Sequence, residues 1–218
     1  MKDIVVFGAG DAGELADFYF ARAGRKVAAF VVDDREKAPA LLQGRPVVAF
    51  ADLMKAYPPS KFDAFVAIGY SKMNTVRREK FLTFKKLGYV LANCVSQTAS
   101  VNPLKIGENN MIQEGVIIQP FAEIGDNCVF WGGTHIGHHS KVASHCFFGP
   151  RVAVAGHVHI GETSFLGINS TIKNHVKIGR GVLVAAGALV VEDVPDEMLV
   201  RGLKSKMVAV DDPVGQKI

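Results

Sequence analysis

Histidine is the side chain in this sequence best suited to proton transfer, and its distribution is uneven. Imidazole titrates close to neutral pH, so it can act as a general base for an amine or hydroxyl that must lose a proton when it attacks a carbonyl carbon. All seven histidines fall between residues 135 and 175, which is where we expect acid–base chemistry: His135, His138, His139, His145, His157, His159 and His175.

A phosphate-binding pattern lies at the other end of the chain. Gly8, Gly10 and Gly13 form a Gly-x-Gly-x-x-Gly motif between an apolar strand-like segment and a helix-like one. Such a turn lets a phosphate approach the N-terminus of the helix closely. Asp33 follows about 20 residues further on, the spacing at which an acid binds ribose in NAD enzymes. The motif alone fits NAD and a nucleotide sugar equally well.

The segments around this motif alternate between strand and helix. Helices are expected over residues 12–23 and 72–87, and strands over the apolar runs at 3–10, 26–32, 45–50, 62–69 and 89–94. Strands separated by helices indicate a parallel sheet that is covered on both faces. This unit, residues 1–95, is too short for the six strands of a complete dinucleotide-binding fold.

From about residue 100, a period of six replaces the helical period. Every sixth residue from Ile106 to Val190 is bulky and apolar. The residue directly after each of these is often Gly, and the fourth residue after each is nearly always small. This alternation is typical of a three-sided coil with bulky residues inside and Gly at its bends. Residues 106–195 should form five coils of 18 residues, stacked as parallel strands ~4.8 Å apart.

Stacking at 18 residues brings particular side chains together. Cys128 and Cys146 fall in one column, and we interpret them as small interior residues rather than redox groups. Gly156 should lie directly over His138 in the next coil, so that its missing side chain leaves a slot beside the imidazole.

Composition excludes several classes of function. The net charge of +4 is mild and the Lys and Arg residues are scattered, so a nucleic-acid partner is not expected. No apolar run approaches the ~20 residues of a membrane span, and the chain enters a strand at once without a signal-peptide core. The three cysteines form no C-x-x-C pair. We therefore expect a cytoplasmic protein without a disulfide framework.

The repeat resembles that of the hexapeptide-repeat acyltransferases, whose β-helix is left-handed. With a small α/β domain in front, the whole chain is similar to the sialic acid O-acetyltransferase and bacillosamine N-acetyltransferase group. The segments that carry the resemblance are VVFGAGDAGE, FVVDD, FVAIG, LANCVSQTASV, HIGHHSKV, FLGINSTI, VAAGALVVEDVP and LVRGLKSKM. The resemblance implies acetyl transfer from acetyl-CoA to a nucleotide-linked, amino-bearing sugar in bacterial surface-glycan synthesis. It also implies a homotrimer with active sites between subunits, and no metal.

The resemblance assigns roles to residues of both parts. The β-helix domain, residues 96–218 with the C-terminal tail, would carry His138 as the general base and a groove for acetyl-CoA. The Gly156 N–H could meet the oxyanion of the tetrahedral intermediate. The acetyl-CoA positions are Gly156, Ile168, Ala186, Arg201 and Lys204, with Lys206 beside them. The nucleotide-sugar positions, mostly in residues 1–95, are Gly8, Gly10, Asp11, Gly13, Asp33, Asp34, Gly69, Tyr70 and Trp131.

Several residues depart from the pattern of that family. His139 stands where a carboxylate commonly orients the base, and an imidazole there brings no negative charge. Trp131 and Tyr70 replace asparagines, and Phe147 replaces a second histidine, which points to a different sugar. The helix with Arg77, Arg78, Lys80, Lys85 and Lys86 is interpreted as a solvated face.

Three alternatives stay open from the sequence. The first is O-acetylation of a sugar such as a sialic acid. A second is a zinc hydratase of the γ-carbonic anhydrase kind, since His139, His157 and His175 should form one outward column. A straight column at ~4.8 Å steps is, however, too long for one ion to reach all three. The third alternative makes the first domain an NAD- or nucleotide-sensing module on a trimeric scaffold.

Overall fold

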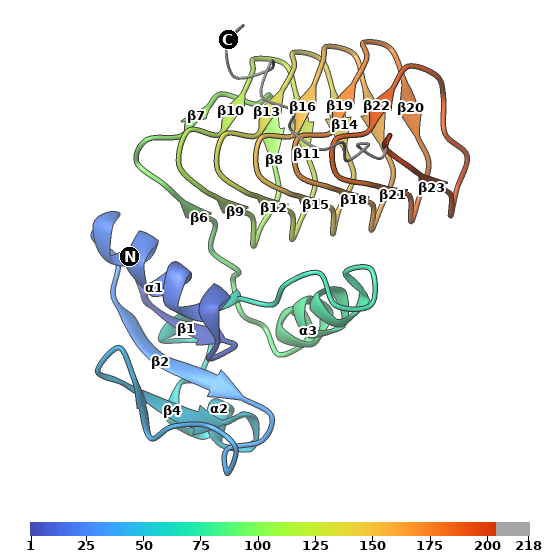
Figure 1. Ribbon diagram of the computed structural model, residues 1–218. Coiled ribbons are helices and arrows are strands. Elements are labelled where there is room, and N and C mark those ends of the chain that lie inside the picture. Colours follow the sequence, from blue (N-terminus) through green and yellow to red (C-terminus); the bar gives the residue numbers. More distant parts are fainter. Residues whose placement is uncertain (204–218) are drawn as a thin grey trace, which may run out of the picture.

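The computed structural model describes residues 1–203, which divide between a small α/β unit and a longer β-helix (Figure 1). In the α/β unit the strands follow the order β3-β4-β2-β1-β5. Four of them are parallel, and β3 pairs antiparallel with β4. The strands are β1 (Asp3–Phe7), β2 (Val27–Val32), β3 (Leu41–Leu42), β4 (Arg45–Ala49) and β5 (Phe62–Val66). The four parallel strands confirm the first four predicted runs.

Helices cover both faces of this sheet, as the alternation of strands and helices predicts. They are α1 (Asp11–Arg22), a short 3-10 helix at Phe50–Asp52, α2 (Leu53–Ala56) and α3 (Thr75–Lys86). Side chains alternate along β1, so Val6 packs in the cluster that contains Phe20 of α1. Its neighbour Phe7 packs in the opposite cluster with Phe84 of α3.

The β-helix consists of three parallel sheets that form its three sides. The first sheet contains β6 (Cys94–Val95), β9 (Met111–Ile112), β12 (Val129–Phe130), β15 (Phe147–Phe148), β18 (Phe165–Leu166), β21 (Leu183–Val184) and β23 (Leu199–Val200). The second contains β7 (Ser100–Val101), β10 (Ile117–Ile118), β13 (His135–Ile136), β16 (Ala153–Val154), β19 (Thr171–Ile172) and β22 (Leu189–Val190). The third contains β8 (Lys105–Ile106), β11 (Glu123–Ile124), β14 (Lys141–Val142), β17 (His159–Ile160) and β20 (Lys177–Ile178).

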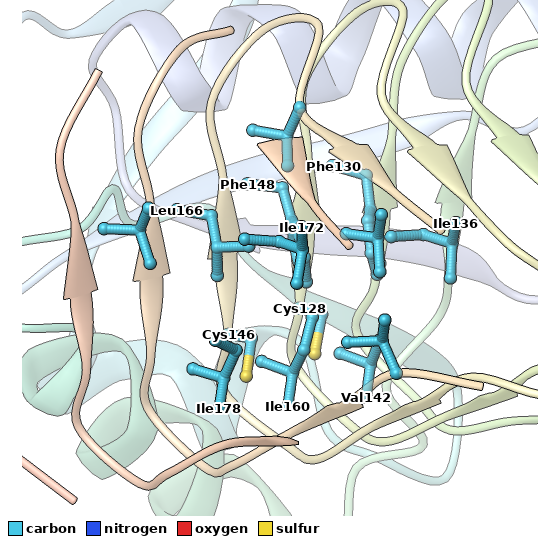
Figure 2. Packing of buried hydrophobic residues seen from close by; sticks show 14 of the residues in the cluster. Cys128, Phe130, Ile136, Val142, Cys146, Phe148, Ile160, Leu166, Ile172 and Ile178 are labelled. Carbon is cyan, nitrogen blue, oxygen red and sulfur yellow. The ribbon is translucent and has the colours of Figure 1, made fainter. Parts of the chain in front are cut away.

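Residues 18 apart pair across neighbouring coils, which confirms the predicted register. Ile118 pairs with Ile136, and Phe130 pairs with Phe148. The second residue of each strand points inward, and these side chains fill the interior together with Cys128 and Cys146 (Figure 2). Both cysteines are buried and unpaired, in agreement with their interpretation as interior residues. At the bends the coils come very close, since a Cβ added to Gly125 would lie 2.6 Å from the Ser144 nitrogen.

The first residue of each strand points outward, and the three sides differ in these residues. The first sheet presents apolar side chains, of which Cys94, Met111, Val129 and Phe147 pack against α1 and the small sheet. The second presents mostly small or apolar residues, Ser100, Ile117, His135, Ala153, Thr171 and Leu189. The third presents Lys105, Glu123, Lys141, His159 and Lys177. One side is therefore covered by the α/β unit, one is weakly polar and one is charged.

The strand predicted over residues 89–94 is wrong. Leu91 makes only a single bridge to Ala64 of β5, and Cys94 already begins the β-helix in β6. The run is apolar because its two ends are buried in different cores. The β-helix also begins earlier than Ile106, at Cys94. Its first coil is one residue shorter than the others, since Cys94 pairs with Met111, 17 residues further on. That shift takes the first coil out of the six-residue phase.

None of the helices within residues 1–203 has the length and hydropathy that a bilayer crossing requires.

Candidate active site

His138 lies in the turn between β13 and β14, at the edge where the second and third sheets meet. Its Nδ1 is 3.0 Å from Nδ1 of the exposed His139, and its backbone N–H donates to Gln119 Oε1 at 2.9 Å. One of the two Nδ1 atoms must carry the hydrogen of this bond. When His138 is the donor, its Nε2 keeps a free lone pair that can accept a proton.

Gly156 lies against this imidazole, as the 18-residue spacing predicts. A Cβ added to Gly156 would be 2.7 Å from Cε1 and 2.9 Å from Nε2 of His138, so any side chain there would displace the ring. Within residues 1–203 the Gly156 N–H donates no hydrogen bond, whereas the next residue, His157, donates to the His138 carbonyl at 3.0 Å. An unused N–H therefore lies beside a potential base.

The other exposed histidines of this edge form the predicted column. The rings of His139 and His157 stack with centroids 4.8 Å apart, and those of His157 and His175 with centroids 4.9 Å apart. Phe121 continues the column on the other side of His139, at 4.8 Å. Two such steps separate His139 from His175, which is well beyond the span of two Zn–N bonds of ~2 Å. One ion cannot bind all three histidines of the column.

A cavity of about 490 Å³ lies between the α/β unit and the first sheet of the β-helix. It is at the carboxyl ends of β1 and β5, where the chain order of the sheet reverses direction. Open parallel sheets bind ligands at this kind of crevice. The lining residues include five of the predicted sugar-site positions: Gly10, Asp11, Gly69, Tyr70 and Trp131.

The glycines of the motif divide into two kinds. Gly8 and Gly13 are required by packing, because an added Cβ would lie 2.4 Å from the Ala67 oxygen and 2.3 Å from the Gly8 oxygen, respectively. A Cβ on Gly10 or Gly69 would meet nothing within 4 Å, so these two leave room for a ligand. Gly10 is also the N-cap of α1, whose first N–H groups can bind a phosphate.

Asp33 and Asp34 follow β2 at the same edge of the sheet but do not line the cavity. Asp33 accepts a hydrogen bond from Lys80 at 2.6 Å, and Asp34 pairs with Lys37 at 2.6 Å. A ribose hydroxyl would have to share Asp33 with Lys80.

Aromatic side chains line part of the cavity, and Phe165 packs beside them. Phe147 and Phe165, on successive coils, stack at 5.2 Å, and the ring of Tyr70 meets both edge-on. The indole N–H of Trp131 is buried without a hydrogen-bond partner in the described part of the chain. Phe165 had no predicted role, although the 18-residue column through Phe147 would have found it.

The predicted acetyl-CoA positions are not brought together within one chain. Gly156 lies with His138 at the edge between the second and third sheets. Ile168 and Ala186 are exposed in turns at the other edge of the second sheet, the edge that also carries Trp131. Arg201 is exposed after β23. Lys204 and Lys206 lie outside the described residues.

The solvated-face interpretation of the helix at 72–87 is wrong for Arg77, which is 1% exposed. Its guanidinium donates to the carbonyl oxygens of Asn127, His145 and Cys146 at 3.1–3.2 Å, and to that of Gly69 at 2.8 Å. Burial lowers the pKa of Arg77 to about 10, so it stays protonated at neutral pH. It thus links the loop at Gly69 to the β-helix.

Next to Arg77, a buried polar column joins the two parts of the molecule. The Asn109 amide bonds both the N–H and the carbonyl of Val66 in β5, at 2.7 and 3.2 Å, and donates to Asn127 at 2.8 Å. Asn127 in turn is 2.8 Å from Nδ1 of His145. Burial, with the nearby cations Arg77 and Arg78, lowers the pKa of His145 to about 4. His145 therefore stays neutral and accepts this bond.

These features define a class, a parallel β-helix of hexapeptide repeats with an α/β unit on one side. A family model described as bacterial transferase hexapeptide (six repeats) matches residues 103–138 and 157–191. Among curated proteins, none matches the chain.

Solved structures match nearly the whole chain. PerB from Caulobacter crescentus, in complex with CoA and GDP-perosamine, is 30% identical over 91% of this chain and 93% of that one, with a TM-score of 0.82. A variant of perosamine N-acetyltransferase from Caulobacter crescentus, with the same ligands, is 28% identical over 96% and 98%, with a TM-score of 0.85. The acetyltransferase domain of PglB from Neisseria gonorrhoeae, with acetyl coenzyme A, is 26% identical over 91% and 95%, with a TM-score of 0.82.

The chain belongs to the hexapeptide-repeat sugar acetyltransferases with a left-handed β-helix, the group that its motifs resemble. It is an acyltransferase.

Proposed function

We propose that this enzyme transfers the acetyl group of acetyl-CoA to an amino group of a nucleotide-linked sugar, with His138 as the general base. The observation that carries the proposal is the free Nε2 of His138 against Gly156, a residue without a side chain. Similar structures bind CoA and GDP-perosamine, and perosamine N-acetyltransferase is one of them, which favours N- over O-acetylation.

The chemistry follows from the atoms at this edge of the β-helix. The sugar amine attacks the thioester carbonyl carbon while its proton passes to Nε2 of His138. The oxyanion that forms can accept the unused Gly156 N–H, a contact typically worth ~2.7–4 kcal/mol. The C–S bond then breaks, and the imidazolium returns the proton to the departing thiolate of CoA.

A homotrimer would bring together the residues that one chain keeps apart. His138 with Gly156, and Trp131 with Ile168 and Ala186, lie on opposite edges of the second sheet. The third sheet is charged and the first is covered, so the weakly polar second sheet is the side best suited to face a threefold axis. Its outward Leu189 and Ile117 are 65% and 43% exposed in the single chain. The two different edges of neighbouring subunits would then meet.

The two parts of the chain would divide the substrates. In residues 1–95, the N-terminus of α1 at Gly10 and Asp11 would hold phosphate, Asp33 and Asp34 the nucleoside, and Gly69 and Tyr70 the sugar. In residues 96–218, Ile168, Ala186 and Arg201 would line the acetyl-CoA groove, and Lys204 is assigned there on its sequence position alone. Acetyl-CoA and nucleotide sugars are used in the cytoplasm, which is the compartment we propose.

A direct test measures release of the CoA thiol from acetyl-CoA over a panel of UDP-, GDP- and dTDP-linked sugars. Each amino sugar is paired with the sugar that carries a hydroxyl at the same carbon. We expect release with at least one amino sugar and none with its hydroxyl partner. Release with hydroxyl sugars alone would show an O-acetyltransferase. Tight NAD binding by calorimetry, without release from any sugar, would instead favour the sensing module.

A further inference from the structure

We propose that His138, His139 and His157 form a binding site for a divalent transition-metal ion such as Zn²⁺, and that the ion inhibits the enzyme by occupying its base. The metal would be a regulator or inhibitor of the reaction, not its cofactor. The inhibitory effect rests on the proposed role of His138, whereas the binding site itself does not.

The geometry of the three imidazoles carries the proposal. One ring nitrogen from each residue can be chosen so that all three lie within 4.8 Å of one another. The two Nδ1 atoms of His138 and His139 are 3.0 Å apart, close to the separation of two ligands on one ion at ~2.0–2.1 Å. His157 closes the group, since its ring is stacked on that of His139 and meets that of His138 edge-on at 5.2 Å.

The third ligand needs only a side-chain rotation to come within bonding distance. All three histidines are exposed in the single chain, so their rings can turn without disturbing the interior of the β-helix. The ligand set contains imidazole nitrogens alone, which suit Zn²⁺, Ni²⁺ or Cu²⁺ rather than Mg²⁺ or Ca²⁺. This trio differs from the straight column through His175, because the His138 ring approaches from the side and meets the rings of both His139 and His157 edge-on at 5.2 Å.

A metal ion in this position would prevent base catalysis whichever nitrogen of His138 it binds. When the ion takes Nε2, the lone pair that faces Gly156 is lost. When it takes Nδ1, Nε2 carries the hydrogen of the neutral ring and cannot accept another proton. Removal of the ion by a chelator should restore activity completely, since no covalent bond of the protein changes.

The test uses the full-length protein with Zn²⁺ or Co²⁺ alone as the probe. Bound Co²⁺ is followed by its visible absorption, Zn²⁺ by competition with Co²⁺, and acetyl transfer by CoA release. The informative variant is His157→Phe, and the matched control is His175→Phe, one coil further along the same column. Phenylalanine suits both positions, because Phe121 already occupies this column with φ of 65° and stacks on His139.

We expect the wild-type protein and His175→Phe to bind one ion per chain with equal affinity. In His157→Phe the affinity for the ion should fall by at least a factor of about 10–100. Loss of a residue that only contacts a metal ligand already costs this much. Zn²⁺ should inhibit acetyl transfer over the same concentration range in which it binds. Absence of binding, or equal binding by His157→Phe, would overturn the site. Binding without inhibition would overturn the inhibitory role, and an enzyme without any acetyl transfer would contradict the proposed function while leaving the binding result intact.

Discussion

His138 and Gly156 depend on each other for their proposed roles. The imidazole occupies the space where a Gly156 side chain would be, and in return Gly156 exposes its N–H beside Nε2 of His138. His139 forms a hydrogen bond with Nδ1, the other nitrogen of the His138 ring. The proposed base, oxyanion donor and orienting partner therefore come from two neighbouring coils, and their relative positions follow from the fixed spacing of the coils.

This dependence predicts the effect of one added methyl group. Gly156→Ala should lower the rate of acetyl transfer by about 10²-fold, since a displacement of about 1 Å can cost that much. Its backbone is not in the left-handed region, so alanine should not strain the fold. Asn174→Ala, 18 residues further on, is the matched control and should keep the wild-type rate. An unchanged rate in Gly156→Ala, measured by CoA release at saturating substrates, would refute this arrangement.

Helix α3 positions the loop at Gly69, which belongs to the proposed sugar site, through one buried cation. Arg77 binds three carbonyl oxygens of the β-helix and the carbonyl of Gly69, which lines the cavity. The carbonyls of Asn127 and His145 have no other donor within residues 1–203. The contact between α3 and the β-helix should therefore depend strongly on this side chain.

Loss of Arg77 should lower the stability of the protein. Arg77→Met leaves buried carbonyls without a donor, each of which costs about 1–3 kcal/mol of the free energy of unfolding. Arg78→Met is the control, because Arg78 is half-exposed and its one ion pair within residues 1–203 is a surface pair with Glu162 at 3.3 Å. Denaturant unfolding should show the loss in Arg77→Met alone. A similar loss in both variants, or in neither, would contradict the role of Arg77.

The elements differ in how far the sequence predicted them. The coils after Ile106 and the approach of Gly156 to His138 follow from one fixed period, because interior side chains must repeat with the stacking of the backbone. Arg77 could not be found this way, since a basic residue in a helix is normally solvated and its burial depends on carbonyls far away in the chain. The short first coil at Cys94 also breaks the period. The residue before each inward-pointing aliphatic side chain points outward. Assigning these outward residues to the three sides of the coil would have revealed the apolar side that the α/β unit covers.

At the scale of the whole molecule, the proposed site is divided between two edges of the β-helix. The cavity with Gly10, Tyr70 and Trp131 lies at the first sheet, whereas His138 lies where the second and third sheets meet. The proposal that neighbouring subunits join these halves implies that a defect in one half can be compensated by another chain. Such compensation would not occur if each active site lay within one subunit.

The most direct measurement is the activity of mixed trimers made from two inactive variants. His138→Ala removes the proposed base and should lose about 10²–10⁴-fold in rate. Gly10→Val should block the cavity without disturbing the fold, because a Cβ on Gly10 meets nothing within 4 Å. Trimers assembled by coexpression of the two variants should regain acetyl transfer, since each mixed trimer contains an intact site built from the good half of each chain. Mixed trimers that form but remain as inactive as the parent variants would contradict the shared active site.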